Sequence, residues 1–279
     1  MSASPITCLN GTFLPAAEAR IPVTDRGFRF GDGVFETIRL EHGRPYQWEL
    51  HLSRLHAGLA ALRITPPSID WRAIADEIIT QNQATDGFLR LTVTRGSGSK
   101  GYVPDANITP TWLMEYLPAS EPPEAPYKLW VSIIQRSPLT ALPTNHKLAH
   151  GIGSTLALLD ARDNGCDEAL MLSSTGKLCE AASANLFWIK DGTLYTPALS
   201  TGCLAGTTRD AVLRLAPIPT QEVIAEVDAL ATAEAVFLSN TRLGIWPVAA
   251  LIPEGWEYDA NHSCIAELSL RLDNDRANA

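Results

Sequence analysis

One lysine in this sequence stands out as a candidate nucleophile. The chain has 22 basic residues, and its only lysines are Lys100, Lys128, Lys147, Lys177 and Lys190. Lysine is almost never buried without a partner, so the lysines beside turns are expected to be solvated. Lys147 is instead followed by Leu148-Ala149 and an aliphatic helix. That setting is expected to remove water from the amine, lower its pKa and make it a better nucleophile and base. A solvated surface amine is the alternative.

A carboxylate follows the lysine after a predicted helix and hairpin. Glu180 ends a predicted strand and is followed by Ala-Ala-Ser-Ala, with no basic residue near it in sequence. Such a carboxylate could accept a hydrogen bond from the protonated nitrogen of a pyridine ring, which preserves the ring's capacity to take up electrons. A carboxylate that faces water at a sheet edge is the alternative.

A third segment has the residue types of a phosphate site. Gly206-Thr207-Thr208-Arg209 opens a predicted helix with small hydroxyl residues and backbone amides, which suits an anion. An ordinary helix capped by threonine is the alternative. Arg54 on a helix and Thr241 after a strand are weak signals when taken alone.

The elements that must position these residues follow from periodicity. Residues 34–40 alternate as a strand, and residues 48–64 carry leucines at spacings of three and four, which predicts a helix with one apolar stripe. Arg54 lies off that stripe. Asn10-Gly11 between short apolar runs predicts a hairpin near the start of the chain. Strands and helices mix without a strict βαβ rhythm, so we expect an α+β fold.

A proline-rich segment marks the predicted domain boundary. Residues 118–126 contain Pro118, Pro122, Pro123 and Pro126 and show no apolar periodicity, as in a stiff connector. We therefore predict a small N-terminal domain at residues 1–117 and a larger C-terminal domain at residues 127–279.

The composition favours a globular enzyme and argues against several other classes. The chain has 279 residues, 46% of them hydrophobic and 19% charged, with a formal charge of −9 that disfavours bulk nucleic-acid binding. Apolar runs fall short of the roughly 20 residues of a membrane span. No export signal opens the chain, and the five scattered cysteines indicate reduced thiols. We expect a cytoplasmic protein. The chain has no zinc-spaced His/Cys cluster, and we predict no metal site.

Eight segments spread along the chain resemble one enzyme family in the family's order. They are residues 25–39, 51–55, 147, 165–170, 180–187, 196–197, 204–209 and 247–248. On these segments the chain resembles the class IV (fold-type IV) pyridoxal-phosphate enzymes, a group that includes branched-chain and D-amino-acid transaminases and aminodeoxychorismate lyase. The resemblance implies two α/β domains with the cofactor in the cleft between them, and a homodimer whose sites borrow a loop from the neighbouring subunit.

The resemblance also implies a role for each candidate residue. Lys147 becomes the lysine that binds pyridoxal 5'-phosphate covalently and moves the substrate proton. Glu180 becomes the partner of the pyridine nitrogen. The implied phosphate ligands are Arg54, Thr207, Thr208 and Thr241.

The choice among members of the family depends on a few positions. Phe35-Glu36-Thr37 is most similar to the lyases, in which the corresponding threonine takes part in proton movement, so Thr37 is predicted to be catalytic. The segment from Arg95 to Tyr102 is similar to a lyase loop that usually has arginine at position 100. The family usually has asparagine at position 150. The predicted substrate-binding residues are Phe35, Arg95, Lys100, Tyr102 and His150.

Three functions follow, in order of preference. The first is 4-amino-4-deoxychorismate lyase, which releases pyruvate and forms 4-aminobenzoate in the folate pathway. The second is a transaminase that acts on D-amino acids, branched-chain amino acids or small amines. Lys100, His150 and Phe35 keep it open, because a lysine is a point charge where an arginine would bind a carboxylate at two points. The third is a non-catalytic protein that binds pyridoxal phosphate, although such a protein would be expected to have lost Lys147 or Glu180.

Overall fold

The computed structural model describes residues 4–278, which form two compact units. The first unit contains residues 4–121 and His146–His150, and the second contains Pro122–Asn145 and Gly151–Asn278. Each unit has its own β-sheet and hydrophobic core. The mixture of helices with predominantly antiparallel sheets confirms the predicted α+β class.

The chain returns once from the second unit to the first. The units first separate after Glu121, within the proline-rich segment 118–126. The predicted domain 127–279 includes His146–His150, but this segment packs in the first unit, because its backbone is hydrogen-bonded to a strand more than a hundred residues earlier. Residues 1–3 and 279, which belong to the two predicted domains, lie outside the described residues.

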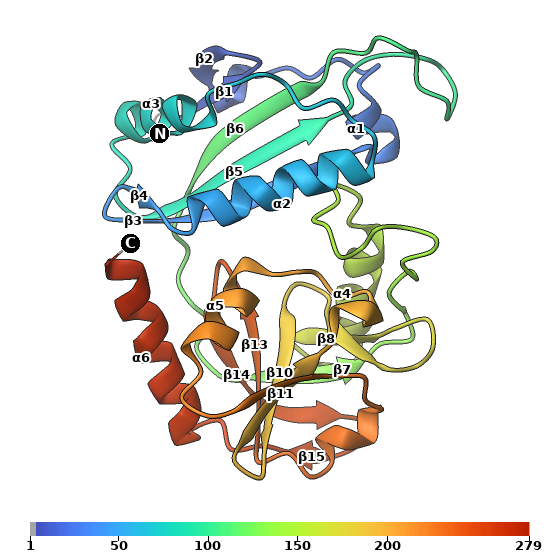
Figure 1. The fold of residues 1–279 in the computed structure, drawn as a ribbon, viewed down its shortest axis with the longest axis vertical. Coiled ribbons are helices and arrows are strands. Elements are labelled where there is room, and N and C mark those ends of the chain that lie inside the picture. Colours follow the sequence, from blue (N-terminus) through green and yellow to red (C-terminus); the bar gives the residue numbers. More distant parts are fainter. Residues whose placement is uncertain (1–3, 279) are drawn as a thin grey trace. The chain divides into compact units, whose positions relative to one another are not determined.

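The first unit is built on a six-stranded antiparallel sheet with the order β2-β1-β6-β5-β3-β4 (Figure 1). Its strands are β1 (Ile6–Leu9), β2 (Thr12–Pro15), β3 (Gly33–Glu41), β4 (Arg44–Pro45), β5 (Gly87–Thr94) and β6 (Thr111–Pro118). Asn10 and Gly11 join β1 to β2 with φ of 49° and 88°. Two positive φ angles are what a type I′ hairpin turn requires, and the predicted hairpin is present.

Strand β3 separates its residues between the two faces of this sheet. Its buried side chains include Val34, Glu36, Ile38 and Leu40, and its half-buried ones are Phe35, Thr37, Arg39 and Glu41. Alternation assigns successive side chains to opposite faces. Helices α2 (Trp48–Ala61) and α3 (Trp71–Asn82) contribute to the same core as the buried face, and Figure 1 shows α2 lying along the sheet. A short helix, α1 (Arg26–Phe30), precedes β3.

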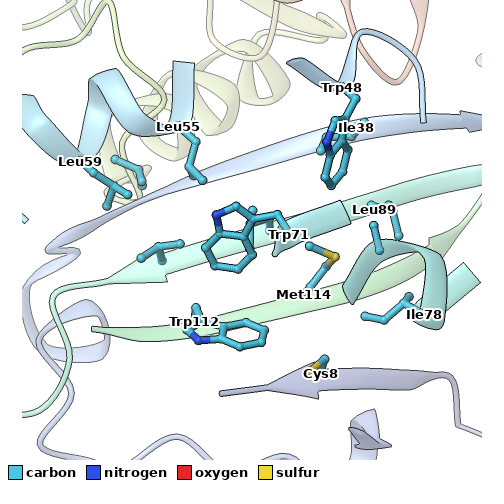
Figure 2. Packing of buried hydrophobic residues seen from close by; sticks show 14 of the residues in the cluster. Cys8, Ile38, Trp48, Leu55, Leu59, Trp71, Ile78, Leu89, Trp112 and Met114 are labelled. Carbon is cyan, nitrogen blue, oxygen red and sulfur yellow. The ribbon is translucent and has the colours of Figure 1, made fainter. Parts of the chain in front are cut away.

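The core of the first unit is rich in large aromatic side chains. Trp71 of α3 packs edge-on against Trp112 of β6 with ring centroids 5.2 Å apart. Figure 2 shows these rings beside Met114, with Leu55 and Leu59 reaching down from α2. Each fully buried side chain of this size contributes roughly 1.5–3 kcal/mol by leaving water, so this core is what fixes β3 and α2.

The second unit is built on a nine-stranded mixed sheet. Eight strands follow the order β12-β11-β10-β13-β14-β7-β8-β9, and β15 pairs with β14. The strands are β7 (Tyr127–Val131), β8 (Glu168–Leu172), β9 (Leu178–Ala181), β10 (Asn185–Lys190), β11 (Thr193–Pro197), β12 (Thr220–Val223), β13 (Ala235–Asn240), β14 (Gly244–Ile252) and β15 (Trp256–Glu257). The rings of Phe187 and Phe237 stack across β10 and β13 with centroids 5.0 Å apart.

Three α-helices complete the second unit: α4 (Ile152–Asp163), α5 (Thr207–Leu215) and α6 (Ser263–Ala277). A further short helix is expected from the sequence at residues 229–235. That expectation is wrong, because a 3-10 turn covers Val227–Leu230 and Ala235 already belongs to β13. None of the helices within residues 4–278 is long and apolar enough to cross a membrane.

Candidate active site

Backbone pairing with β3 positions Lys147 in the first unit. The N–H of Phe35 donates to the carbonyl of Lys147 at 3.0 Å, and the N–H of Ala149 donates to Gly33 at 2.8 Å. The Lys147 Nζ lies 4.6 Å from the centroid of the Phe35 ring. An ammonium at this distance is attracted to the face of an aromatic ring. The half-buried lysine is therefore held against the half-buried face of β3.

Thr37 lies on the same face of β3 as Phe35. Next to it lies Arg90 of the neighbouring strand β5, a cation that sequence patterns did not single out. Thr37 lies two residues from Phe35, and Arg90 of β5 is its direct partner in the sheet. The Arg90 Cζ lies 4.3 Å from the centroid of the Phe35 ring. Phe35 thus contacts both Lys147 and Arg90. Alternation in β5 predicts the face on which Arg90 lies. That Lys147 lies against β3 is shown only by the pairing of residues 146–150 with that strand.

Arg54 is part of a buried charged cluster on the other side of β3. Its Nε donates to Oε1 of Glu36 at 2.8 Å, and one terminal nitrogen donates to Oε2 at 2.6 Å. His51 Nδ1 lies 2.7 Å from the same Oε2. Burial raises the pKa of Glu36, but the charge and hydrogen bonds of Arg54, with those of His51, outweigh it and lower this pKa to about 2. Since the carboxylate only accepts, Nδ1 carries the proton of His51.

Arg95 supports the end of helix α2. Its Nε and one terminal nitrogen donate to the two oxygens of Asp32 at 2.7 and 3.0 Å. Its other donors bind the carbonyls of Leu62 at 2.7 Å and Arg63 at 3.0 Å. The structure therefore places this predicted substrate residue in a network that joins β5 to the loop after α2.

The loop that carries Lys100 and Tyr102 is anchored by a buried arginine. Arg26 donates to Ser99 Oγ at 3.0 Å and to the carbonyls of Gly101 and Tyr102 at 2.8 Å each. Lys100 and Tyr102 are exposed, and the Tyr102 side chain contacts Phe30 with ring centroids 5.4 Å apart. The contacts of Arg26 and of the Tyr102 ring join this loop to α1.

Two histidines flank Lys147 in sequence. His150 packs on Gly31, where a Cβ would lie 2.8 Å from the His150 Cβ, and Gly31 has a φ of 66° that favours glycine. His146, which was not predicted to have a role, has its pKa lowered by burial and by the charge of Arg54. The segment therefore brings two imidazoles and one amine to the first unit.

In the second unit, Glu180 is buried, and its donors include Arg136, Leu204 and Asn185. A terminal nitrogen of Arg136 lies 2.8 Å from its Oε1. The N–H of Leu204 donates to Oε2 at 3.0 Å, and Asn185 Nδ2 donates to the same atom at 3.4 Å. The carboxylate is only 7% exposed, which contradicts the alternative of a water-facing edge residue. Arg136 and Asn185 were not predicted.

The start of α5 has the features of an anion site. Gly206 is the N-cap of this helix and no side chain of the described residues caps it. Thr207 and Thr208 are buried, and a Cβ at Gly206 would lie 2.1 Å from Asn185 Oδ1, so a larger residue would require the Asn185 side chain to move. Uncapped N–H groups at a helix start attract phosphate. Thr241 is half-buried in the turn that follows β13.

A family model described as "Amino-transferase class IV" matches residues 33–251. This match covers most of the chain and includes every candidate from Thr37 to Thr241. The chain belongs to the class IV aminotransferase family.

Relatives of this class IV chain include both transaminases and a lyase. A protein of Methanocaldococcus jannaschii, provisionally named a branched-chain-amino-acid aminotransferase, is 34% identical over 86% of this chain and 85% of its own length. The crystal structure of 4-amino-4-deoxychorismate lyase from Pseudomonas aeruginosa is 31% identical, with a TM-score of 0.83 over 96% of this chain and 98% of that one. The T.th. branched-chain amino acid aminotransferase with pyridoxamine 5'-phosphate is 25% identical, with a TM-score of 0.88 over 100% of this chain and 96% of that one.

The family membership makes this chain a lyase or aminotransferase that uses pyridoxal 5'-phosphate. When bound, the cofactor supplies an aldehyde that reacts with amines and a pyridine ring that takes up electrons. The residues of the second unit fit such a group. Ser239 of β13 pairs with Asn185 of β10 in the sheet. Its Oγ is buried and makes no hydrogen bond within residues 4–278. A buried hydroxyl of this kind needs a partner, and the uncapped start of α5 is suited to an anion.

Proposed function

We propose that this enzyme is a 4-amino-4-deoxychorismate lyase. The observation that supports this function best is the position of Thr37, two residues from Phe35 on the face of β3 that Lys147 contacts. The reaction removes a proton from the substrate ring and adds one to the departing enolpyruvyl group. A hydroxyl and an amine against the same strand face are suited to moving two protons.

We propose a role toward the cofactor for each candidate residue. With the cofactor present, Lys147 would hold it and take the ring proton of the substrate, and Thr37 would deliver a proton as pyruvate leaves. Glu180 binds the pyridine nitrogen. The phosphate is bound by the four residues predicted for it: Arg54, Thr207, Thr208 and Thr241.

The substrate carries two carboxylates, which need cations. Arg90 is suited to one of them, because it lies on the same face as Thr37 and contacts the ring of Phe35. We propose Lys100 and Tyr102 for the other end of the substrate and His150 for a contact near Lys147. We propose that Arg95 has an indirect role, because its hydrogen bonds go to Asp32 and to the carbonyls of Leu62 and Arg63.

A transaminase is the second candidate, and Arg90 is the observation that favours it. A guanidinium beside the ring that contacts Lys147 could bind the distal carboxylate of an acceptor such as 2-oxoglutarate. The donors would be branched-chain amino acids, D-amino acids or small amines. A non-catalytic binding protein is the third candidate and has the least support, since Lys147 and Glu180 are both present.

Two assays on the purified holoenzyme test the proposal. With aminodeoxychorismate, the lyase forms fluorescent 4-aminobenzoate without converting the cofactor to its pyridoxamine form. With D-alanine or leucine and 2-oxoglutarate, a transaminase gives that conversion, and this result would refute the lyase. Loss of the cofactor's visible absorbance band in Lys147→Ala tests the role of the lysine.

A matched pair of variants tests Thr37. Thr37→Val removes the hydroxyl and should lower the lyase rate by about a hundredfold, the scale of a lost proton donor. Thr92→Val makes the same change at the β5 residue opposite Phe35 and should have a much smaller effect. Equal rates for the two variants would contradict the proposed role of Thr37.

We also propose that the enzyme is a cytoplasmic homodimer. All five cysteines are buried free thiols, which is consistent with a reducing compartment. Sedimentation of the purified holoenzyme at a monomer mass would contradict the dimer.

A further inference from the structure

The buried face of β3 contains one charged residue, Glu36. Its neighbours on this face are Val34, Ile38 and Leu40, and its own side chain is 0% exposed. Removing a carboxylate from water is costly unless it is paired and hydrogen-bonded. An apolar residue would satisfy the core at this position, so the carboxylate needs a reason beyond packing.

Two side chains of α2 hold Glu36. Both of its oxygens bind Arg54, at 2.8 and 2.6 Å, and His51 Nδ1 lies 2.7 Å from Oε2. His51 and Arg54 are three residues apart, so they lie on one face of the helix. A planar guanidinium held at two nitrogens cannot turn without breaking both hydrogen bonds.

The charges of this cluster also favour a fixed arginine. The charges of Glu36 and Arg54 cancel. Burial lowers the pKa of His51, and so do the charges of Arg54 and Lys147, whereas Glu36 acts in the opposite direction. A neutral His51 donates its Nδ1 proton to the carboxylate without adding a charge. His146 also lies close enough to sense the charge of Arg54.

We propose that Glu36 and His51 are positioning residues for the cofactor phosphate. They set the orientation in which Arg54 presents its guanidinium, and they hold it before the cofactor arrives. The inference rests on the proposed role of Arg54 as a phosphate ligand. A purely structural ion pair would have the same distances, so the test must respond to phosphate specifically.

The experiment compares pyridoxal phosphate with pyridoxal, which lacks the phosphate, by absorbance titration of the full-length apoenzyme. Glu36→Gln places an amide N–H against an arginine N–H and frees the guanidinium to turn. The affinity for pyridoxal phosphate should fall by about tenfold or more, the scale of a lost hydrogen bond to a charged group. The affinity for pyridoxal should remain nearly unchanged.

Asp32→Asn is the matched control. Asp32 also binds arginines in the same unit, Arg95 through both oxygens and Arg26 through one. This variant should leave the ratio of the two affinities unchanged. Equal losses for both ligands in Glu36→Gln, no loss, or tighter binding of pyridoxal phosphate would each overturn the proposal.

Two further variants keep the test decisive if Glu36→Gln does not fold. His51→Asn can keep a donor near the position of Nδ1, while His51→Leu cannot. We expect the leucine variant to lose phosphate-specific affinity and the asparagine variant to regain much of it, and similar ratios for the two would refute the role of His51. Arg54→Gln distinguishes the phosphate role of Arg54 from the positioning role of Glu36 and His51. If this variant leaves the ratio of the affinities for pyridoxal phosphate and pyridoxal unchanged, Arg54 does not bind the phosphate. If it lowers the ratio while Glu36→Gln and His51→Leu do not, the positioning role alone is wrong.

Discussion

Glu36 in the first unit and Glu180 in the second are both buried carboxylates paired with one arginine, but the two pairs are built differently. Glu36 binds two nitrogens of Arg54 at 2.8 and 2.6 Å. Glu180 binds one nitrogen of Arg136 at 2.8 Å, and its other oxygen accepts the N–H of Leu204. On the roles proposed above, the carboxylate orients the arginine in the first pair, whereas the arginine and the backbone orient the carboxylate in the second.

This difference assigns opposite roles to the same residue types. Where the arginine is the group proposed to contact the cofactor, loss of its partner carboxylate should lower the affinity for the cofactor. Where the carboxylate meets the cofactor, its loss should affect the rate. Variants of the two pairs can therefore confirm or remove the distinction.

The largest effect is expected for Glu180→Gln. Without its charge the pyridine nitrogen loses the partner that keeps it protonated, so kcat should fall by about a hundredfold or more while phosphate affinity changes little. Glu36→Gln should show the reverse pattern. Product formation by the two holoenzymes gives kcat, and cofactor titration of the two apoenzymes gives the affinity. Matching patterns would remove the distinction between the pairs.

The next effect concerns stability in acid. The pKa of Glu36 is lowered to about 2 from 4.5, so its ionised form stabilises the fold above the unfolded pKa, and this contribution is lost as the pH falls from 4.5 towards 2. The loss should amount to about 3 kcal/mol of unfolding free energy. Urea unfolding at several pH values should show a shallower decline over this range in Glu36→Gln than in the natural chain. Parallel declines would contradict the assignment.

The same two carboxylates show what sequence can reveal. Glu180 was found because a strand, a small-residue run and a family motif surround it. Glu36 was read as a polar position in an alternating strand and as part of the Phe35-Glu36-Thr37 motif, but neither pattern shows which residues pair with it. Its partners His51 and Arg54 are three residues apart on α2, and only the packing of that helix on β3 brings the three together.

Long-range pairing explains the other residues that were missed. Thr37 and Phe35 were recognised from a motif, but Arg90 became a candidate only through its register opposite Thr37. The elements themselves, such as the hairpin at Asn10 and the helix from Trp48, follow from local patterns and were predicted. Contacts between distant segments depend on the whole core, which no single segment encodes.

A smaller effect is expected for Arg136→Gln. Glu180 would keep its hydrogen bond from Leu204 but lose a charged partner, so kcat should fall by about tenfold, less than in Glu180→Gln. Steady-state rates of the two variants and of their combination give the comparison. If Arg136 acts only through Glu180, the double variant should be no slower than Glu180→Gln, and fully additive losses would exclude that dependence.

The smallest effect tests whether burial, and not pairing itself, gives these arginines their importance. Arg271 and Glu267 form an ion pair at 2.6 Å on α6, and their side chains are 45% and 50% exposed. Water and salt screen such a pair, so Glu267→Gln should change the unfolding free energy by less than about 0.5 kcal/mol. The pairs of Glu36 and Glu267 have the same closest distance, 2.6 Å. A loss at Glu267 as large as that at Glu36 would mean that proximity alone determines the energy, and the argument from burial would fail.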